Sequence, residues 1–182
     1  MSTAVLVREA PRIETERLVL RHWRKDDLRP WLEVMQRPET NRFLGSAAIT
    51  PEDLWRRLSA AVGSWSLMGF GGWAVTHRDS DQVIGNVGFF NAWRDLEPVF
   101  GEDPEMGWIF SPDVQGHGYA MEAGRAALGW AQESLAPTAM WAIIAPGNEP
   151  SIRLARKLGF EPVHETTYHD EPTLVLRRPA WG

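Results

Sequence analysis

The chain has 182 residues, enough for one domain with a sizeable core, and its 43% hydrophobic and 24% charged residues are ordinary for a soluble globular protein. It contains no cysteine, which excludes disulfides, thiolate metal sites and cysteine nucleophiles, and no metal site is predicted. The net charge of −5 argues against a nucleic-acid partner and suits a cationic substrate.

Apolar periodicity and turn residues predict strands and helices along the whole chain. Asp26 and Asp27 mark one helix start, and the cap Thr50, followed by Pro51, marks another. In the first part of the chain we predict a strand at 17–23, helices at 26–36 and 50–67, a turn at 69–72 and a hairpin of strands 73–77 and 82–91. A loop at 92–104 follows, and then a strand at 105–110 and a glycine turn that opens a helix ending at about 133. The last part is predicted to hold a strand at 140–145, a helix at 148–158 and strands at 161–168 and 173–178. This order indicates a single α/β domain over residues 1–182, with a mixed sheet covered by helices on both faces.

The N-terminal residues 1–11 lack an apolar run as long as that of a signal peptide or a membrane span, so we expect a cytoplasmic protein without membrane association. Ten tryptophans are many for a chain of this size. We expect most of them in the core or in an interface and a few in a pocket. An interface of this kind would suit a homodimer.

The most informative segment is Gln115-Gly116-His117-Gly118-Tyr119-Ala120, between a predicted strand and a predicted helix. Small residues at such a turn let successive backbone N–H groups converge on an anion, and the helix N-terminus adds the positive end of its dipole. A diphosphate fits this arrangement. The chain has neither a lysine-serine phosphate loop nor a dinucleotide fingerprint here, which disfavours a nucleoside triphosphate and a nicotinamide cofactor.

Three further segments accompany this turn: residues 14–21, Asn148-Glu149-Pro150-Ser151, and Lys157-Leu158-Gly159-Phe160. Together they make the chain, from about residue 13 to 178, resemble the GNAT superfamily of acyl-CoA-dependent N-acetyltransferases, in particular the branch of RimJ and RimL. The resemblance implies a GNAT fold, with a mostly antiparallel sheet of six or seven strands and a splayed central strand pair. It also implies acetyl-CoA as the cofactor and acetyl transfer to a primary amine by direct attack in a ternary complex.

The resemblance assigns cofactor-binding roles to particular residues. The backbone of Trp108, Ile109 and Phe110 would bind pantetheine like an added strand. The amides from Gln115 to Ala120 would hold the pyrophosphate, with His117 beside a phosphate, and Asn148 would orient the pantetheine or the thioester. Simpler interpretations stay open: glycines that only shape a turn, an exposed loop histidine, and Asn148 as a helix N-cap.

Deprotonation of the amine requires a base, most simply a carboxylate acting directly or through water. Glu105 opens the strand at 105–110, on the same face as Gly107 and Ile109, and it ends an acidic stretch that includes Glu97, Glu102 and Asp103. The other interpretation of Glu105 is the last residue of a solvated loop. Glu165 and Asp170 are the reserve candidates.

The residue that supplies a proton to the leaving thiolate in many members of the family is not present at the usual position of this chain. Many GNAT enzymes place a tyrosine seven residues after the asparagine, where this chain has Ala155. The resemblance to the Rim-like branch gives the role to Ser151, which would orient the reactants or relay a proton through water. Ser151 can also be read as a residue of the first helical turn only.

The sequence does not identify the amine that accepts the acetyl group. A lysine amine with a pKa near 10.4 is rarely neutral in the cytoplasm, whereas an α-amine near 7.7–8.0 often is, which modestly favours an α-amine. The aromatic walls of its pocket are predicted to be Trp31, Phe43, Phe89, Phe90 and Trp93. The alternatives are an acetyltransferase for an antibiotic, a polyamine or an amino acid, and a CoA-binding sensor without turnover.

Overall fold

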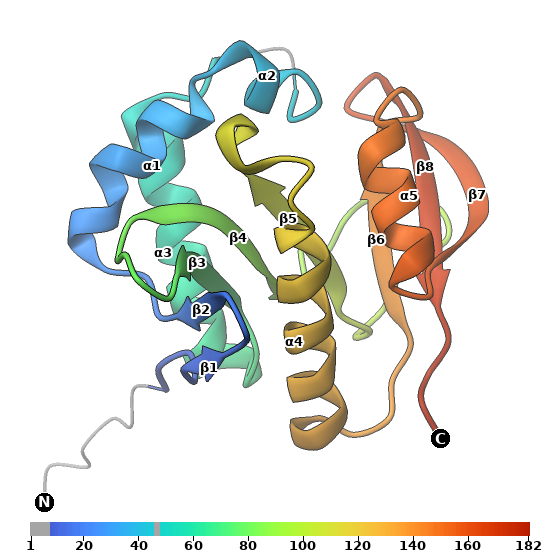
Figure 1. Cartoon of the computed structure of the whole chain (residues 1–182). Helices are drawn as coiled ribbons and strands as arrows, with labels where there is room; N and C mark the ends of the chain where they lie inside the picture. The colour runs from blue at the N-terminus through green and yellow to red at the C-terminus, as the bar shows by residue number, and fades with distance from the viewer. Residues whose placement is uncertain (1–7, 46–47) are drawn as a thin grey trace, which may run out of the picture.

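The computed structural model describes residues 8–45 and 48–182 as an eight-stranded sheet with helices on both faces (Figure 1). The strand order is β1-β2-β3-β4-β5-β6-β8-β7, and among these described strands only β5 and β6 pair in parallel. The strands are β1 (Ile13–Glu14), β2 (Leu18–Arg21), β3 (Gly72–His77), β4 (Val83–Phe90), β5 (Glu105–Phe110), β6 (Met140–Ile144), β7 (Glu161–Tyr168) and β8 (Glu171–Arg178). The helices are η1 (Lys25–Asp27), α1 (Leu28–Met35), α2 (Pro38–Asn41), α3 (Pro51–Met68), η2 (Pro112–Val114), α4 (Tyr119–Ser134) and α5 (Glu149–Lys157).

Local sequence chemistry sets most of the helix ends. Thr50 caps α3: its hydroxyl accepts a hydrogen bond from the Asp53 N–H, and the Asp53 carboxylate accepts one from the Thr50 N–H. The same helix ends at Gly69, whose φ of 79° is the left-handed conformation that favours glycine. These features confirm the predicted helix. The predicted strand at 105–110 is also confirmed with both of its ends.

Two features differ from the sequence-based prediction. The sheet has eight strands rather than six or seven, because the two-residue strand β1 pairs with Val19 and Leu20 of β2. A pairing that short leaves no alternation in the sequence to detect. The helix expected from Asp26 begins instead as the 3₁₀ turn η1, and α1 follows it from Leu28.

The core lies on both faces of the sheet. On one face α4 and α5 cover strand residues such as Val75 and Val87, whereas α1 and α3 pack on the other face around Ala74. Both α4 and α5 lie in front of the sheet in Figure 1. Several of the tryptophans are core residues: Trp73 packs edge-on against Trp65 at 4.7 Å and Trp130 at 5.1 Å. Five of the ten tryptophans are buried, Trp23, Trp31, Trp65, Trp73 and Trp141, whereas Trp55 and Trp93 are exposed. The expected core positions are confirmed for these five, and the expected interface stays a prediction.

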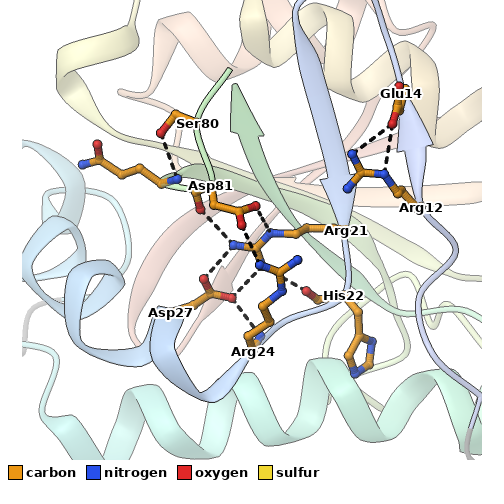
Figure 2. A network of polar contacts seen from close by, with 9 residues as sticks. Arg12, Glu14, Arg21, His22, Arg24, Asp27, Ser80 and Asp81 are labelled. Atoms are coloured by element: carbon orange, nitrogen blue, oxygen red, sulfur yellow. Dashed lines mark hydrogen bonds and ion pairs between the residues drawn. The ribbon is translucent and has the colours of Figure 1, made fainter. Parts of the chain in front are cut away.

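A buried ion pair ties β2 to the elements around it (Figure 2). Arg21 is 4% exposed and donates to both carboxylate oxygens of Asp27, at 2.7 and 2.8 Å. It also donates to the carbonyl of Asp81, in the turn between β3 and β4. The hydrogen bond to Asp27 raises the pKa of Arg21, so the guanidinium stays charged. The network fixes the β3–β4 turn beside the N-terminal strands.

Candidate active site

The central strands β5 and β6 separate almost as soon as they pair. One registered pair joins them, Glu105 with Trp141, and the Trp141 N–H donates to the Pro104 carbonyl at 2.9 Å. No further pair joins β5 to β6 in the described part of the chain. We call the gap that opens between β5 and β6 the splay. Because the two strands run parallel, their carboxyl ends lie together at its open end (Figure 1). In α/β sheets, ligands bind beyond the carboxyl ends of strands at such a point.

The direction of the β5 backbone groups follows from two hydrogen bonds. The Ser111 N–H donates to the Ile84 carbonyl of β4 at 2.8 Å, whereas the Pro104 carbonyl accepts from β6. Because backbone groups alternate along a strand, Trp108 and Phe110 direct their N–H and C=O groups toward the splay. Ile109 directs its own toward Asn86 of β4. Of the three residues whose backbone was predicted to bind pantetheine, Trp108 and Phe110 therefore direct their hydrogen-bonding groups toward the splay, and Ile109 does not.

The glycine turn begins just beyond the open end of β5. Gly116 and Gly118 have φ values of 81° and 80°, and Gly118 is the N-cap of α4. The first α4 hydrogen bond runs from the Glu122 N–H to the Gly118 carbonyl at 3.1 Å. The N–H groups of Gly118, Tyr119 and Ala120 have no hydrogen-bond acceptor within residues 8–45 and 48–182. Adjacent donors of this kind at a helix N-terminus can bind an anion.

Two residues of the turn differ from the rest of the predicted set. The Gln115 N–H donates to the Pro112 carbonyl at 3.3 Å, so this amide is already used within η2. The exposed His117 has its Nδ1 at 3.0 Å from the Gln115 carbonyl. A carbonyl oxygen only accepts, so Nδ1 carries the proton in this contact and Nε2 is left for another partner.

Asn148 and Ser151 lie at the start of α5, beyond the open end of β6. The Asn148 Oδ1 accepts a hydrogen bond from the Ser151 N–H at 3.3 Å and caps the helix. Its Nδ2 donates to no acceptor in the described residues. The Ser151 Oγ accepts a bond from Trp108 Nε1 at 3.4 Å, which joins α5 to β5 across the splay. Asn148 is therefore a cap and still has two amide hydrogens to offer a ligand.

Glu105 does not end a solvated loop. It is 3% exposed, and its two carboxylate oxygens accept hydrogen bonds from Arg94 at 2.5 and 2.9 Å. Burial raises the pKa of Glu105 above its ordinary value, and the hydrogen bonds and charge of Arg94 offset only part of this effect. The Arg94 guanidinium also stacks over the ring of Tyr168, 5.0 Å from its centre. The carboxylate is thus one half of a buried ion pair.

The aromatic residues predicted to line the acceptor pocket fall into three groups. Trp31 and Phe89 are 2% and 0% exposed within the hydrophobic cores, so their prediction as pocket walls was wrong. Amphipathic patterning cannot separate a core aromatic from one at the edge of a cavity. Trp93 is 76% exposed and, with Arg94 and Glu105, lines a hollow of about 120 Å³ under residues 91–103.

The remaining two lie closer to the splay. The ring of Phe90 lies 2.9 Å from where a Cβ on Gly107 would be, so it covers the sheet face on which Glu105 also lies. Phe43, just after α2, lies 3.7 Å from where a Cβ on Gly147 would be, which places it beside the loop that leads to Asn148. Phe43 and Phe90 are therefore the predicted aromatics that border the open end and its sheet face.

Three residues near the site were not identified from the sequence. Arg94 carried no signal, because its partner is fixed only by the fold. Asn86 is a polar residue within the apolar run of β4, which is a signal; its Oδ1 is buried and has no hydrogen-bond partner within the described ranges. Arg17 belongs to the segment 14–21 that carries the family resemblance, and its side chain reaches the glycine turn. The position of the usual tyrosine, Ala155, is fully buried and supplies no hydroxyl.

Comparisons with known proteins agree with this fold. The family model described as an acetyltransferase (GNAT) domain matches residues 17–161. The uncharacterized N-acetyltransferase YnaD of Bacillus subtilis is 28% identical over 148 residues, which are 81% of each chain. A solved chain from Bordetella pertussis, assigned to the GnaT acetyltransferase family, is 30% identical with a TM-score of 0.82, covering 93% of this chain and 99% of that one.

A more distant solved structure, AAC(6')-Ib in complex with paromomycin and acetyl-CoA, shares the fold. Its TM-score is 0.72 at 18% identity, covering 90% of this chain and 94% of that one. The match of the family model to most of the chain is the decisive observation. The chain therefore belongs to the GNAT superfamily of N-acetyltransferases, in its RimJ/RimL-like branch.

Proposed function

We propose that this N-acetyltransferase uses acetyl-CoA and moves the acetyl group to a primary amine by direct attack within a ternary complex. The observation that carries the proposal is the meeting of three features at one end of the splay. They are the unpaired edge of β5, the free amides at the start of α4, and the Asn148 amide at the start of α5. Amide, diphosphate and thioester groups all require such hydrogen-bond donors.

The contacts of the chain suggest how these groups would share the work. The backbone of Trp108 and Phe110 would pair with pantetheine amides as an added strand does. The amides of Gly118, Tyr119 and Ala120 would hold the diphosphate, with the His117 side chain beside a phosphate. The N–H groups of Trp108 and Phe110 both face the splay, and one of them would polarise the thioester carbonyl. Alignment of both reactants in this way can lower the barrier by about 7–11 kcal/mol.

The proton transfers are assigned to Ser151 and Glu105. The Ser151 hydroxyl accepts a hydrogen bond from Trp108, which leaves its own hydrogen free for another partner. Ser151 would orient the reactants or relay a proton from water to the leaving thiolate, taking up one proton as it gives one away. Glu105 would take the proton of the amine, directly or through water. Its raised pKa favours proton uptake, and each of its oxygens has a second lone pair besides the one used by Arg94.

The acceptor is proposed to be a protein N-terminal α-amine or a small-molecule amine. The buried Asn86 Oδ1 lies on the same sheet face as Ile109 and Glu105 and needs a hydrogen-bond donor, which an amine supplies. An α-amine needs less help from a base than a lysine does. No helix in the described ranges is long and apolar enough to cross a membrane. The cytoplasmic location and the homodimer stay predictions.

The test of this function is release of free thiol from acetyl-CoA with a panel of amines and N-terminal peptides. We expect turnover with at least one α-amine and a product that is heavier by one acetyl group. Aminoglycosides, polyamines and free amino acids belong in the same panel. Because Ala155 supplies no acid, a CoA-binding sensor is the second candidate. CoA binding without turnover on any amine would favour the sensor, and absence of CoA binding would refute both.

Ser151→Ala should lower kcat by about tenfold or more while the affinity for CoA changes little, because the hydroxyl serves proton transfer and not binding. The cap survives, since Asn148 bonds to the backbone N–H of residue 151. Steady-state kinetics and CoA titration measure the two effects. Ser59→Ala, at an exposed position on α3, is the control. Unchanged kcat in the Ser151 variant would leave this serine as a helix-start residue only.

A further inference from the structure

The segment before β2 is bonded to the first part of α4. The carboxylate of Glu122 accepts hydrogen bonds from the Thr15 hydroxyl at 2.6 Å and from the Arg17 N–H at 2.8 Å. The Arg17 guanidinium closes the contact, with Nε at 2.7 Å and Nη2 at 2.6 Å from Glu122 Oε2. These residues are more than 100 positions apart in the chain. The N-terminal segment is thus fixed to the helix that carries the glycine turn.

The same guanidinium reaches the glycine turn itself. Arg17 Nη1 donates to the carbonyl of His117 at 2.9 Å. The guanidinium lies 4.6 Å from the centre of the Tyr119 ring, and Nη2 lies 3.6 Å from where a Cβ on Gly118 would be. One side chain therefore contacts His117 and Tyr119 and lies beside Gly118 between them.

The bond to His117 also sets the direction of an amide. In a planar trans peptide, the carbonyl of one residue and the N–H of the next point in opposite directions. Because the His117 carbonyl is held toward Arg17, the Gly118 N–H is held pointing away from Arg17. Glycine at φ 80° imposes no such direction by itself, since it moves readily among several backbone conformations. Arg17 thus orients one of the free donors of the site.

Further contacts support the bonding of Arg17 to Glu122 and His117. The Arg78 N–H donates to the Arg17 carbonyl at 3.0 Å, and its guanidinium donates to the Thr15 carbonyl at 3.2 Å. Burial would raise the pKa of Glu122, but hydrogen bonds from Thr15 and Arg17 hold it below its ordinary value. Glu122 therefore remains a carboxylate, and the ion pair persists at neutral pH.

We propose that Arg17 is a positioning residue for the diphosphate of acetyl-CoA: held by Glu122, it fixes the His117–Gly118 peptide so that the turn presents its amides to the phosphates. The role rests on the proposed use of acetyl-CoA. It is distinct from a direct charge contact, because Arg17 acts through a peptide of the turn. Only the part of the donor that carries the diphosphate depends on it.

The experiment compares two acetyl donors, acetyl-CoA and S-acetylpantetheine, which lacks the diphosphate. Arg17→Met should raise KM for acetyl-CoA and Kd for CoA about tenfold, because a preorganised donor is lost, while kcat changes little. With S-acetylpantetheine, kcat/KM should equal that of the wild-type protein. Arg12→Met removes the same charge from an exposed arginine that pairs with Glu14. It is expected to leave the kinetic constants with both acetyl donors unchanged.

Further variants separate orientation from charge and from folding. Arg17→Lys keeps the charge but lacks the fork that bonds Glu122 and His117 together, so it should remain impaired with acetyl-CoA. If Arg17→Met fails to fold, Glu122→Gln provides the test: it keeps the shape and should show the same donor-selective loss, about threefold.

Three results would overturn the inference: equal losses with both donors, unchanged CoA affinity, or full rescue by lysine. Failure of the wild-type protein to bind CoA would refute the proposed cofactor and, with it, this role. Failure of the Arg17 role and failure of the proposed cofactor are distinguishable, because only failure of the cofactor leaves the wild-type protein unable to bind CoA in the titration.

Discussion

Glu105→Gln is expected to lower the free energy of unfolding by about 3 kcal/mol or more, measured by chemical denaturation. Arg94, whose side chain is only 18% exposed, donates to both carboxylate oxygens of Glu105. The glutamine amide keeps one acceptor and turns its NH2 donor toward a guanidinium that can only donate, so a buried hydrogen bond of Arg94 is lost and two donors face each other. This variant therefore lowers stability whether or not Glu105 takes part in catalysis.

A double variant separates stability from chemistry. Arg94→Met with Glu105→Leu replaces the whole pair by apolar side chains of similar size, which commonly restores stability. If the double variant is stable but shows no turnover, the pair serves the reaction. Retained turnover would move the general base elsewhere, with Glu165 and Asp170 as the next carboxylates to test.

The pH dependence provides an independent test of Glu105. If this carboxylate is the base, turnover falls as the pH drops through its pKa, which burial places above the ordinary value for glutamate. The folded state binds this proton more readily than the unfolded chain does. The contribution of Glu105 to stability therefore declines as the pH rises between the unfolded and folded pKa values. If turnover of the stable double variant still falls as the pH drops, the fall is caused by the protonation of another group.

Gly118→Val should weaken CoA binding by about a hundredfold, because the turn would lose the geometry of its amides. Gly118 has φ 80° and ψ 4°, a conformation that a β-branched residue adopts only with strain of about 1–3 kcal/mol. A valine would either strain the turn or rotate the peptide that carries the Gly118 N–H. Isothermal titration with CoA measures the effect.

Gly69→Val is a matched control for this substitution. Gly69 has φ 79° and ψ 1°, almost the same conformation, but it ends α3 just before β3, away from the splay. Both variants should lose a similar amount of stability, while only the one at Gly118 should lose CoA binding. Equal CoA affinity in the two variants would show that the glycine turn does not hold the phosphates.

The sequence by itself determined the features that depend on a few neighbouring residues. Thr50 with Asp53 and Pro51 specifies the start of α3, and Gly69 specifies its end, because capping groups act on the backbone of the nearest turn. The bounds of β5 and the glycine turn after it were recognisable for the same reason. Such interactions span three or four residues, and a single sequence contains all of their partners.

Only the tertiary structure decided which distant residues meet. It pairs Glu105 with Arg94 in the interior, and it brings Arg17 to Glu122 and to the glycine turn. It also buries Phe89, which patterning could not distinguish from a pocket residue. Burial and long-range pairing depend on how the sheet and helices close around each other. The charge and the role of a carboxylate such as Glu105 follow from that closure rather than from its neighbours in the chain.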